Sequence, residues 1–275
     1  SGLLINKICK DASERGQKIL LTGHGGDEAF GGYRRYSAAL LIEKYPRLLS
    51  ILSFLAKPFY STLSNDLYRL FRASSSKRNL SHISHLSLIG EQYVLEKNYL
   101  SKEYSSKTIL REVKSQLNSQ VKKNYSGVQQ SMLLDLKGYL PSQNLINADK
   151  QSMNHSIEIR VPFIYKAVVK YGLNLRVSEL LSIKRNKIAL RNLGESIFPK
   201  WYSNSVKSGF GPSLFELVKK EEVKELLISE RTKSRGIVNC NKMLENYSKE
   251  KLNSPDCMMM LNLAFIEQWF RIYID

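Results

Sequence analysis

Five glycines, one histidine and two adjacent carboxylates are concentrated in the stretch LLTGHGGDEAFGGYRRY, which occupies residues 20–36. Glycines that follow a strand let backbone N–H groups approach a phosphate closely, and the loop after a strand is where open α/β sheets bind ligands. Asp27 and Glu28 are acceptors, so a phosphate beside them would need a bridging Mg²⁺. The stretch therefore indicates a nucleotide site with a metal-bound polyphosphate. On spacing alone, the alternative is a glycine turn in which Asp27 caps the next helix.

Three later stretches carry further groups that suit this chemistry. They are LINADKQSMNHSIEIRVPFI at residues 145–164, KIALRNL at 187–193 and PKWYSNSVKSGFGPSLFE at 199–216. In the last stretch Lys207 stands directly before Ser-Gly-Phe-Gly-Pro, and a lysine at such a bend can bring a cation to a phosphate or to a developing anion. In the stretch at residues 145–164, Glu158 and Arg160 are predicted to form a buried ion pair. Together these groups favour the nucleotide site over the simple turn.

In this order, the four stretches resemble motifs of the asparagine synthetase family. The first is similar to S-G-[DE]-G-x-D-E-x-F-G-G-Y, and the second to v-D-r-x-S-M-x-x-S-x-E-x-R-v-P-F. The third and fourth resemble K-x-x-L-R and P-x-x-[x]-x-x-x-K-x-G-F-x-x-P. The resemblance implies an adenine-nucleotide α-hydrolase (ATP pyrophosphatase) fold. It also implies a reaction in which ATP adenylates a carboxylate, pyrophosphate leaves, and ammonia or an amine displaces AMP.

The resemblance implies roles for individual residues of the glycine-rich loop. Asp27 would bind Mg²⁺ on the pyrophosphate. The residues that would contact ATP are Thr22 and Gly23, through their backbone, together with Gly25 and Gly26. The cofactors expected from the resemblance are therefore ATP and Mg²⁺.

Two residues from the later stretches are further catalytic candidates, and the resemblance gives a role to the first of them, Lys207. Lys207 would stabilise charge on the leaving pyrophosphate and on the later tetrahedral intermediate. Asp149 would either orient Lys207 or the reacting base, or simply serve packing, and the sequence leaves both open.

His24 departs from the family pattern. The position is acidic in asparagine synthetases and tyrosine in the related β-lactam synthetases, where it deprotonates an amine. Imidazole in general titrates near ~6.5, so a neutral histidine could accept a proton from an attacking amine. The alternative is that His24 only forms a hydrogen bond within the loop. The first interpretation predicts a changed substrate: a sugar carboxylate, a peptide, or another amine in place of aspartate and ammonia.

Two expected parts of such a synthetase are missing. The phosphate-binding loop S-G-G-x-D-S does not occur in the chain, and Ser1 stands where a glutaminase domain would need a nucleophilic cysteine. The sequence is therefore interpreted as the C-terminal portion of a longer protein or one half of a split one. Its expected partner is the glutaminase and nucleotide-binding portion, in cis or in trans. Alone, the chain is predicted neither to hydrolyse glutamine nor to hold ATP tightly.

The amino-acid composition limits the partners and the cellular location that can be expected. The net charge of +17 suits polyanionic partners. The basic residues are nevertheless spread along the chain, which favours a solvated surface and makes nucleic acid the less favoured partner. No apolar run reaches the ~18 residues of a membrane span. Three widely spaced cysteines without a CxxC motif indicate a reducing, cytoplasmic location. Whether the chain forms a homodimer stays open.

The elements that must position these residues are predicted to be mostly helical. The fold class is α/β with one buried parallel strand at residues 18–21, as a partial ATP pyrophosphatase fold that lacks its N-terminal strands. Residues 1–32 would be the remnant of the nucleotide-binding unit, and 33–275 the mostly helical remainder of one synthetase domain. The expected helices include one that ends before Pro141 and one at 147–156. Another is expected at 255–273, with Met258, Leu261, Ala264, Phe265 and Trp269 on its apolar side.

The leading hypothesis is thus an ATP-dependent, carbon–nitrogen ligase that converts aspartate and glutamine to asparagine. Within the same class, the chain could serve amidation of a sugar acid, or closure of a peptide macrolactam or a β-lactam. The rival from another class is a non-catalytic module that uses its basic surface to hold a partner.

Overall fold

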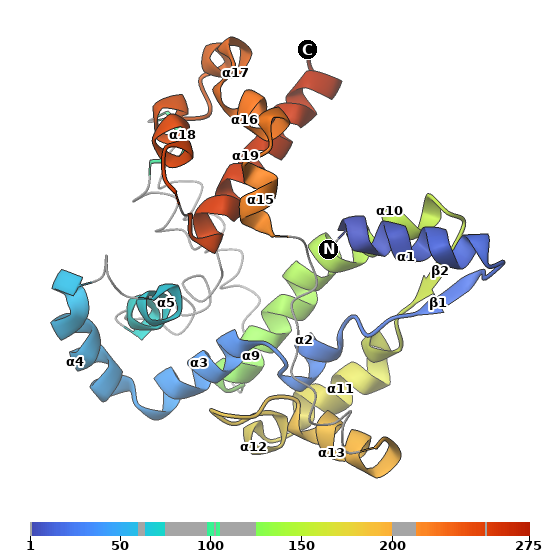
Figure 1. Cartoon of the computed structure of the whole chain (residues 1–275). Coiled ribbons are helices and arrows are strands. Elements are labelled where there is room, and N and C mark those ends of the chain that lie inside the picture. The colour runs from blue at the N-terminus through green and yellow to red at the C-terminus, as the bar shows by residue number, and fades with distance from the viewer. Residues whose placement is uncertain are drawn as a thin grey trace. The chain divides into compact units, whose positions relative to one another are not determined.

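The computed structural model describes residues 2–59, 64–74, 98–101, 103–104, 125–199, 213–250 and 252–275. The chain divides into two compact units. Unit 1 comprises Ser1–Ile83 and Leu117–Gly211, and unit 2 comprises Ser84–Gln116 and Pro212–Asp275. Figure 1 shows that both are built mainly from helices, as predicted for this fold class.

Unit 1 contains one small sheet and the helices that surround it. Its elements are α1 (Gly2–Glu14), β1 (Ile19–Leu21), α2 (Gly26–Phe30), α3 (Arg34–Lys44), α4 (Pro46–Ala56), η1 (Lys57–Phe59), α5 (Asn65–Ser74), α9 (Gly127–Leu134), η2 (Asp135–Leu145), α10 (Ile146–Met153), β2 (Glu158–Arg160), η3 (Pro162–Ile164), α11 (Lys166–Asn174), α12 (Val177–Leu180) and α13 (Ile188–Ile197).

The two strands pair in parallel, and α1 packs beside α10 near them (Figure 1). Leu20 pairs with Ile159, and both pack on a small core formed by Cys9, Ala12 and Ile157. The predicted strand at residues 18–21 is confirmed, and so is its parallel pairing. Its complete burial is wrong, because side chains alternate along a strand: Leu21 is 73% exposed.

The helix predicted at residues 147–156 ends earlier than expected, and strand β2 follows it. Helix α10 ends at Met153, and after a tight turn the chain becomes extended at Glu158. The predicted Glu158–Arg160 ion pair forms, with 2.8 Å between Arg160 Nε and Glu158 Oε1, but the pair is exposed. The burial was wrong because the two charged side chains lie on the open face of the strand, whereas Ile159 between them faces the core.

A second correction concerns Pro141. The helix that begins at Gly127 was expected to end before this proline, yet it continues through it as the π-helix η2. The wider π turns accommodate a residue that has no N–H to donate. As a result, Asp135 and Asn144 stand at opposite ends of one continuous element.

Helix α2, which follows the glycine-rich loop, packs closely on α11. A methyl group built on Gly172 would overlap the carbonyl oxygen of Ala29. We therefore expect Gly172→Ala to lower the free energy of unfolding by roughly 1–3 kcal/mol, the usual effect of overpacking, as measured by urea titration.

The matched control for this prediction is Gly194→Ala in α13, where the nearest atom to an added methyl is Phe198 Cδ2, an ordinary contact at 3.9 Å. This control should be neutral or slightly stabilising, because alanine favours a helix. Equal stability of the two variants would mean that α2 is not held closely against α11.

Unit 2 is organised around the last helix. Its helices are α15 (Leu214–Val218), α16 (Glu221–Ile228), α17 (Glu230–Arg235), α18 (Cys240–Tyr247) and α19 (Ser254–Tyr273). The predicted helix at residues 255–273 is confirmed, and its predicted apolar side is right for Leu261 and Ala264, which are buried. It is wrong for Phe265, which is 70% exposed, and for Trp269, which is also exposed. The buried face also carries Glu267, which pairs with Arg235 at 2.8 Å and with Arg271 at 3.0 Å.

Candidate functional site

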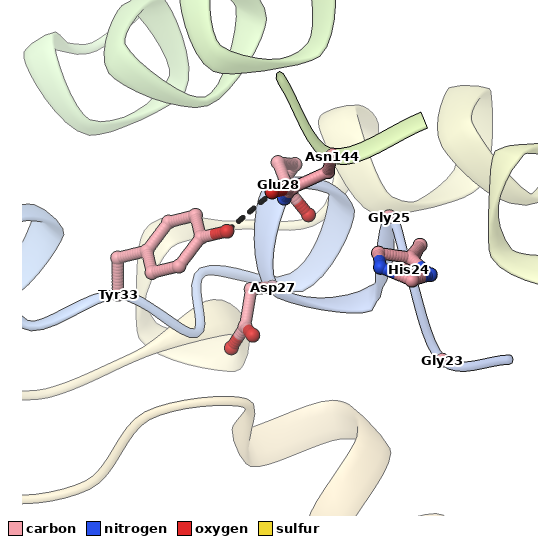
Figure 2. A pocket seen from close by; sticks show the side chains of 7 residues that line it. All are labelled: Gly23, His24, Gly25, Asp27, Glu28, Tyr33 and Asn144. Carbon is pink, nitrogen blue, oxygen red and sulfur yellow. Dashed lines mark hydrogen bonds between the residues drawn. The ribbon is translucent and has the colours of Figure 1, made fainter. Parts of the chain in front are cut away.

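The glycine-rich loop leaves the carboxyl end of β1 and leads into α2, so it stands where parallel sheets bind ligands. A cavity of about 260 Å³ opens there (Figure 2). It is lined by Gly23, His24, Gly25, Asp27, Glu28, Tyr33 and Asn144. Glu28 of α2 and Asn144 near the end of η2 are 116 positions apart in the sequence, and the fold brings both to this cavity.

The structure brings four of the predicted site residues onto this cavity: Gly23, His24, Gly25 and Asp27. Thr22 and Gly26 lie beside it, and their backbone N–H groups already have partners. Thr22 donates to the carbonyl oxygen of Arg160 at 3.0 Å, and Gly26 donates to that of Gly23 at 3.2 Å. In this conformation, those two N–H groups are directed into the protein and not toward a phosphate.

Of the two other predicted catalytic residues, the structure describes Asp149 alone. Asp149 is exposed on α10 and is not among the cavity residues. Lys207 lies outside the described residues. The roles of Asp149 and Lys207 therefore stay predictions.

Asp27 forms an ion pair with Lys187, whose Nζ lies 2.9 Å from Asp27 Oδ1. Lys187 precedes α13 and has a left-handed backbone with φ of 53°. This conformation is unfavourable for a side chain other than glycine and often marks a functional site. Lys187 is the first residue of KIALRNL, but the sequence alone gave it no role.

Asp27 fits a metal site that is completed by a substrate. Among the described residues, no group of three or more His, Cys, Asp or Glu side chains could hold a metal ion. Mg²⁺ commonly uses one or two carboxylates and takes its other ligands from phosphates and water. Asp27 offers one such carboxylate on the cavity, with a compensating cation beside it.

Glu28 lines the cavity, and the resemblance assigned it no role of its own. Only 1% of it is exposed. Tyr33 donates its hydroxyl to Glu28 Oε1 at 2.6 Å, and Asn144 Nδ2 donates to the same oxygen at 3.4 Å (Figure 2). Burial, followed by the hydrogen bond to Glu28, raises the pKa of Tyr33 far above its ordinary value, so the phenol remains a donor.

Tyr33 packs against a cluster of charged and aromatic residues that includes Arg35. The guanidinium of Arg35 stacks 4.0 Å from the centre of the Tyr33 ring. Arg35 is fixed in turn by Asp135, with 2.8 Å between Nη2 and Oδ2, and Tyr36 donates to the same carboxylate at 2.5 Å. The start of η2 thereby supports the residue that contacts Glu28, while the end of η2 supplies Asn144.

His24 has its ring oriented within the loop. The hydroxyl of Thr22 lies 2.8 Å from His24 Nδ1, at hydrogen-bond distance. His24 Nε2 has no hydrogen-bond partner in the described part of the chain, and His24 lines the cavity. The contact with Thr22 is of the kind that the second interpretation describes, and the nitrogen Nε2 on the cavity is compatible with the first, so both interpretations stay open.

These observations define an α/β protein, predominantly helical, with a carboxylate-bearing cavity at the carboxyl end of a parallel strand. The family model described as asparagine synthase matches residues 1–271. The chain therefore belongs to the asparagine synthase family.

Individual relatives agree with this family. The chain is 26% identical over 218 residues to an asparagine synthetase [glutamine-hydrolyzing] of Bacillus subtilis, a match that covers 78% of the chain and 33% of the relative. A putative asparagine synthetase [glutamine-hydrolyzing] of Mycobacterium tuberculosis is 27% identical over 205 residues, which are 70% of the chain and 29% of the relative. The amidase chyE of Penicillium rubens is 25% identical over 260 residues, which are 86% of the chain and 38% of the relative. The chain thus spans about a third of the length of these relatives.

No solved structure matches the chain. None of the helices in the described ranges has the length and apolar character needed to cross a membrane.

Proposed function

We propose that this chain supplies the C-terminal part of a synthetase that uses ATP to join a carboxylate to an amine. The observation that carries the proposal is Asp27, a carboxylate on a cavity at the end of a parallel strand, with Lys187 beside it. A carboxylate for a metal and a lysine for a phosphate are the groups that such a reaction needs. Family membership and the names of the relatives support the same chemistry.

The proposed reaction has two steps. A substrate carboxylate attacks the α-phosphorus of ATP, which forms an acyl-adenylate and releases pyrophosphate. Mg²⁺, when held by Asp27, would neutralise charge on the phosphates. Lys187 would supply further positive charge, together with Lys207 if that residue reaches the site. An amine then attacks the acyl carbon: the C–N bond forms, the C–O bond to AMP breaks, and the proton lost by the amine goes to His24.

We favour a reaction that fits the names of two relatives, which describe synthesis of asparagine with hydrolysis of glutamine. L-aspartate, glutamine, ATP and water would give L-asparagine, glutamate, AMP and pyrophosphate. A cytoplasmic location suits this reaction, and all three cysteines are free in the structure, as expected for reduced thiols.

The small sheet supports the proposal that other strands complete the domain. Two strands of three residues do not make a stable sheet, and Ile19 and Leu21 are apolar side chains exposed on one face. We infer that the nucleotide-binding portion, in cis or in trans, covers this face and adds the missing phosphate loop. The isolated chain should then bind ATP weakly, and a micromolar dissociation constant measured by titration calorimetry would contradict this inference.

The proposed activity is tested by carboxylate-dependent exchange of pyrophosphate into ATP, using the chain together with its nucleotide-binding portion. We expect exchange with aspartate and none without a carboxylate. If a uronic acid supports exchange and aspartate does not, the asparagine assignment fails while amide formation stands. If no carboxylate supports exchange, the proposed adenylation fails.

A further inference from the structure

Glu28 is a buried carboxylate on the wall of the cavity, and among the described residues it has no ion-pair partner. Its neighbour Asp27, by contrast, is neutralised by Lys187. An ionised carboxylate out of water is unfavourable unless a cation compensates it. No cation of the described residues lies in an ion pair with Glu28, which points to a cation that arrives with a ligand.

The hydrogen bonds of Glu28 leave one of its oxygens open. Tyr33 and Asn144 both donate to Oε1, whereas Oε2 receives no hydrogen bond from the residues that the structure describes. The Arg35 cluster holds Tyr33 in place. Glu28 is thus fixed through one oxygen and presents the other as an unused acceptor.

We propose that Glu28 Oε2 binds a primary ammonium group of a substrate, with Asn144 and His24 as further acceptors on the same cavity. This proposal rests on the proposed function, which requires an amine and a carboxylate at this site. Asn144 directs its amide nitrogen toward Glu28, which leaves Oδ1 as an acceptor, and His24 retains Nε2.

The mixed chemistry of these acceptors favours an ammonium over a metal ion. A carboxylate oxygen, an amide oxygen and an imidazole nitrogen can together accept the three N–H bonds of an ammonium. Mg²⁺ demands oxygen ligands in near-octahedral geometry, which an imidazole does not supply. The cavity therefore separates two cation positions, one at Asp27 and one at Glu28.

The first test measures binding of ethylammonium to the full chain by saturation-transfer NMR, with ethanol as the neutral analogue. We expect ethylammonium to bind and ethanol not to bind. Glu28→Gln retains an oxygen for Tyr33 but removes the charge, so binding should weaken at least about tenfold, the effect of losing a charged hydrogen bond. The matched control is Glu14→Gln, the same change on the exposed face of α1.

A melting experiment separates binding from a structural role. If Glu28 serves a ligand, its buried charge lowers the stability of the unliganded protein. Glu28→Gln removes that charge, so its melting temperature should equal that of wild type or be about 2–4 °C higher. Unchanged ethylammonium binding, or a clearly lower melting temperature for Glu28→Gln, would overturn the proposal. Asn144→Ala is a second, independent test, with a loss of binding of about threefold or more expected and equal binding as the contradicting result.

The ammonium could belong to an amino-acid carboxylate or to the attacking amine, and kinetics in the completed protein distinguish the two. In the first case, Glu28→Gln raises the KM for aspartate in pyrophosphate exchange more than the KM for succinate, which lacks the ammonium. In the second case, the variant raises the KM for the amine in amide formation. A rise in neither KM would refute the ammonium site. Absence of exchange in the wild type would refute adenylation and leave the ethylammonium test valid.

Discussion

Replacing Asp27 by asparagine is expected to lower carboxylate-dependent pyrophosphate exchange by at least about 100-fold in the completed protein, a typical loss for one electrostatic group at a reacting centre. The amide is neutral, so it binds Mg²⁺ weakly and leaves Lys187 without its counter-ion. Exchange should be measured across a range of Mg²⁺ concentrations, since a weakened metal site predicts partial recovery at high Mg²⁺.

The matched control is Asp11→Asn, which makes the same change on the exposed surface of α1. It should leave exchange at the wild-type rate. An Asp27→Asn variant that exchanges at the wild-type rate even at low Mg²⁺ would remove Asp27 from the metal site.

The second large effect is expected for Gly32→Ala. A methyl group on Gly32 would overlap Asp27 Oδ1 and Lys187 Cε, so both members of the ion pair would have to move. We expect a loss of exchange of about 100-fold and a decrease in the free energy of unfolding of roughly 1–3 kcal/mol. Parallel exchange assays and urea titrations measure both.

Gly138→Ala is the control for this prediction, because no atom lies within 4 Å of a methyl group built at Gly138. It should retain full exchange and wild-type stability. If Gly32→Ala behaves like this control, Asp27 and Lys187 are not packed against Gly32 in the working enzyme.

Local patterns predicted the first strand and the last helix, because each has a clear apolar signal. They failed where charged residues or proline interrupt that signal. Glu158 and Arg160 bracket a single apolar residue, which is too little to indicate a strand. Pro141 normally ends a helix, and no local pattern predicts the π turns that accommodate it.

The candidate site was only partly predictable for a related reason. The glycine-rich loop is one continuous stretch, so its carboxylate and histidine could be identified directly. Lys187 and Asn144 reach the cavity from distant positions, and the tertiary fold alone brings them there. Glu28 was visible in the sequence, but its burial and its open oxygen were not.

The central claim, that a carboxylate is activated by adenylation, is tested most directly with a substrate whose carboxylate carries ¹⁸O. The completed protein should convert the labelled substrate, ATP and an amine to an amide, and mass spectrometry should find one ¹⁸O atom in the AMP released. This follows because the carboxylate oxygen that attacks the α-phosphorus stays on it when the C–O bond breaks. Label in inorganic phosphate, with ADP as the nucleotide product, would show activation through an acyl phosphate and would contradict the proposal.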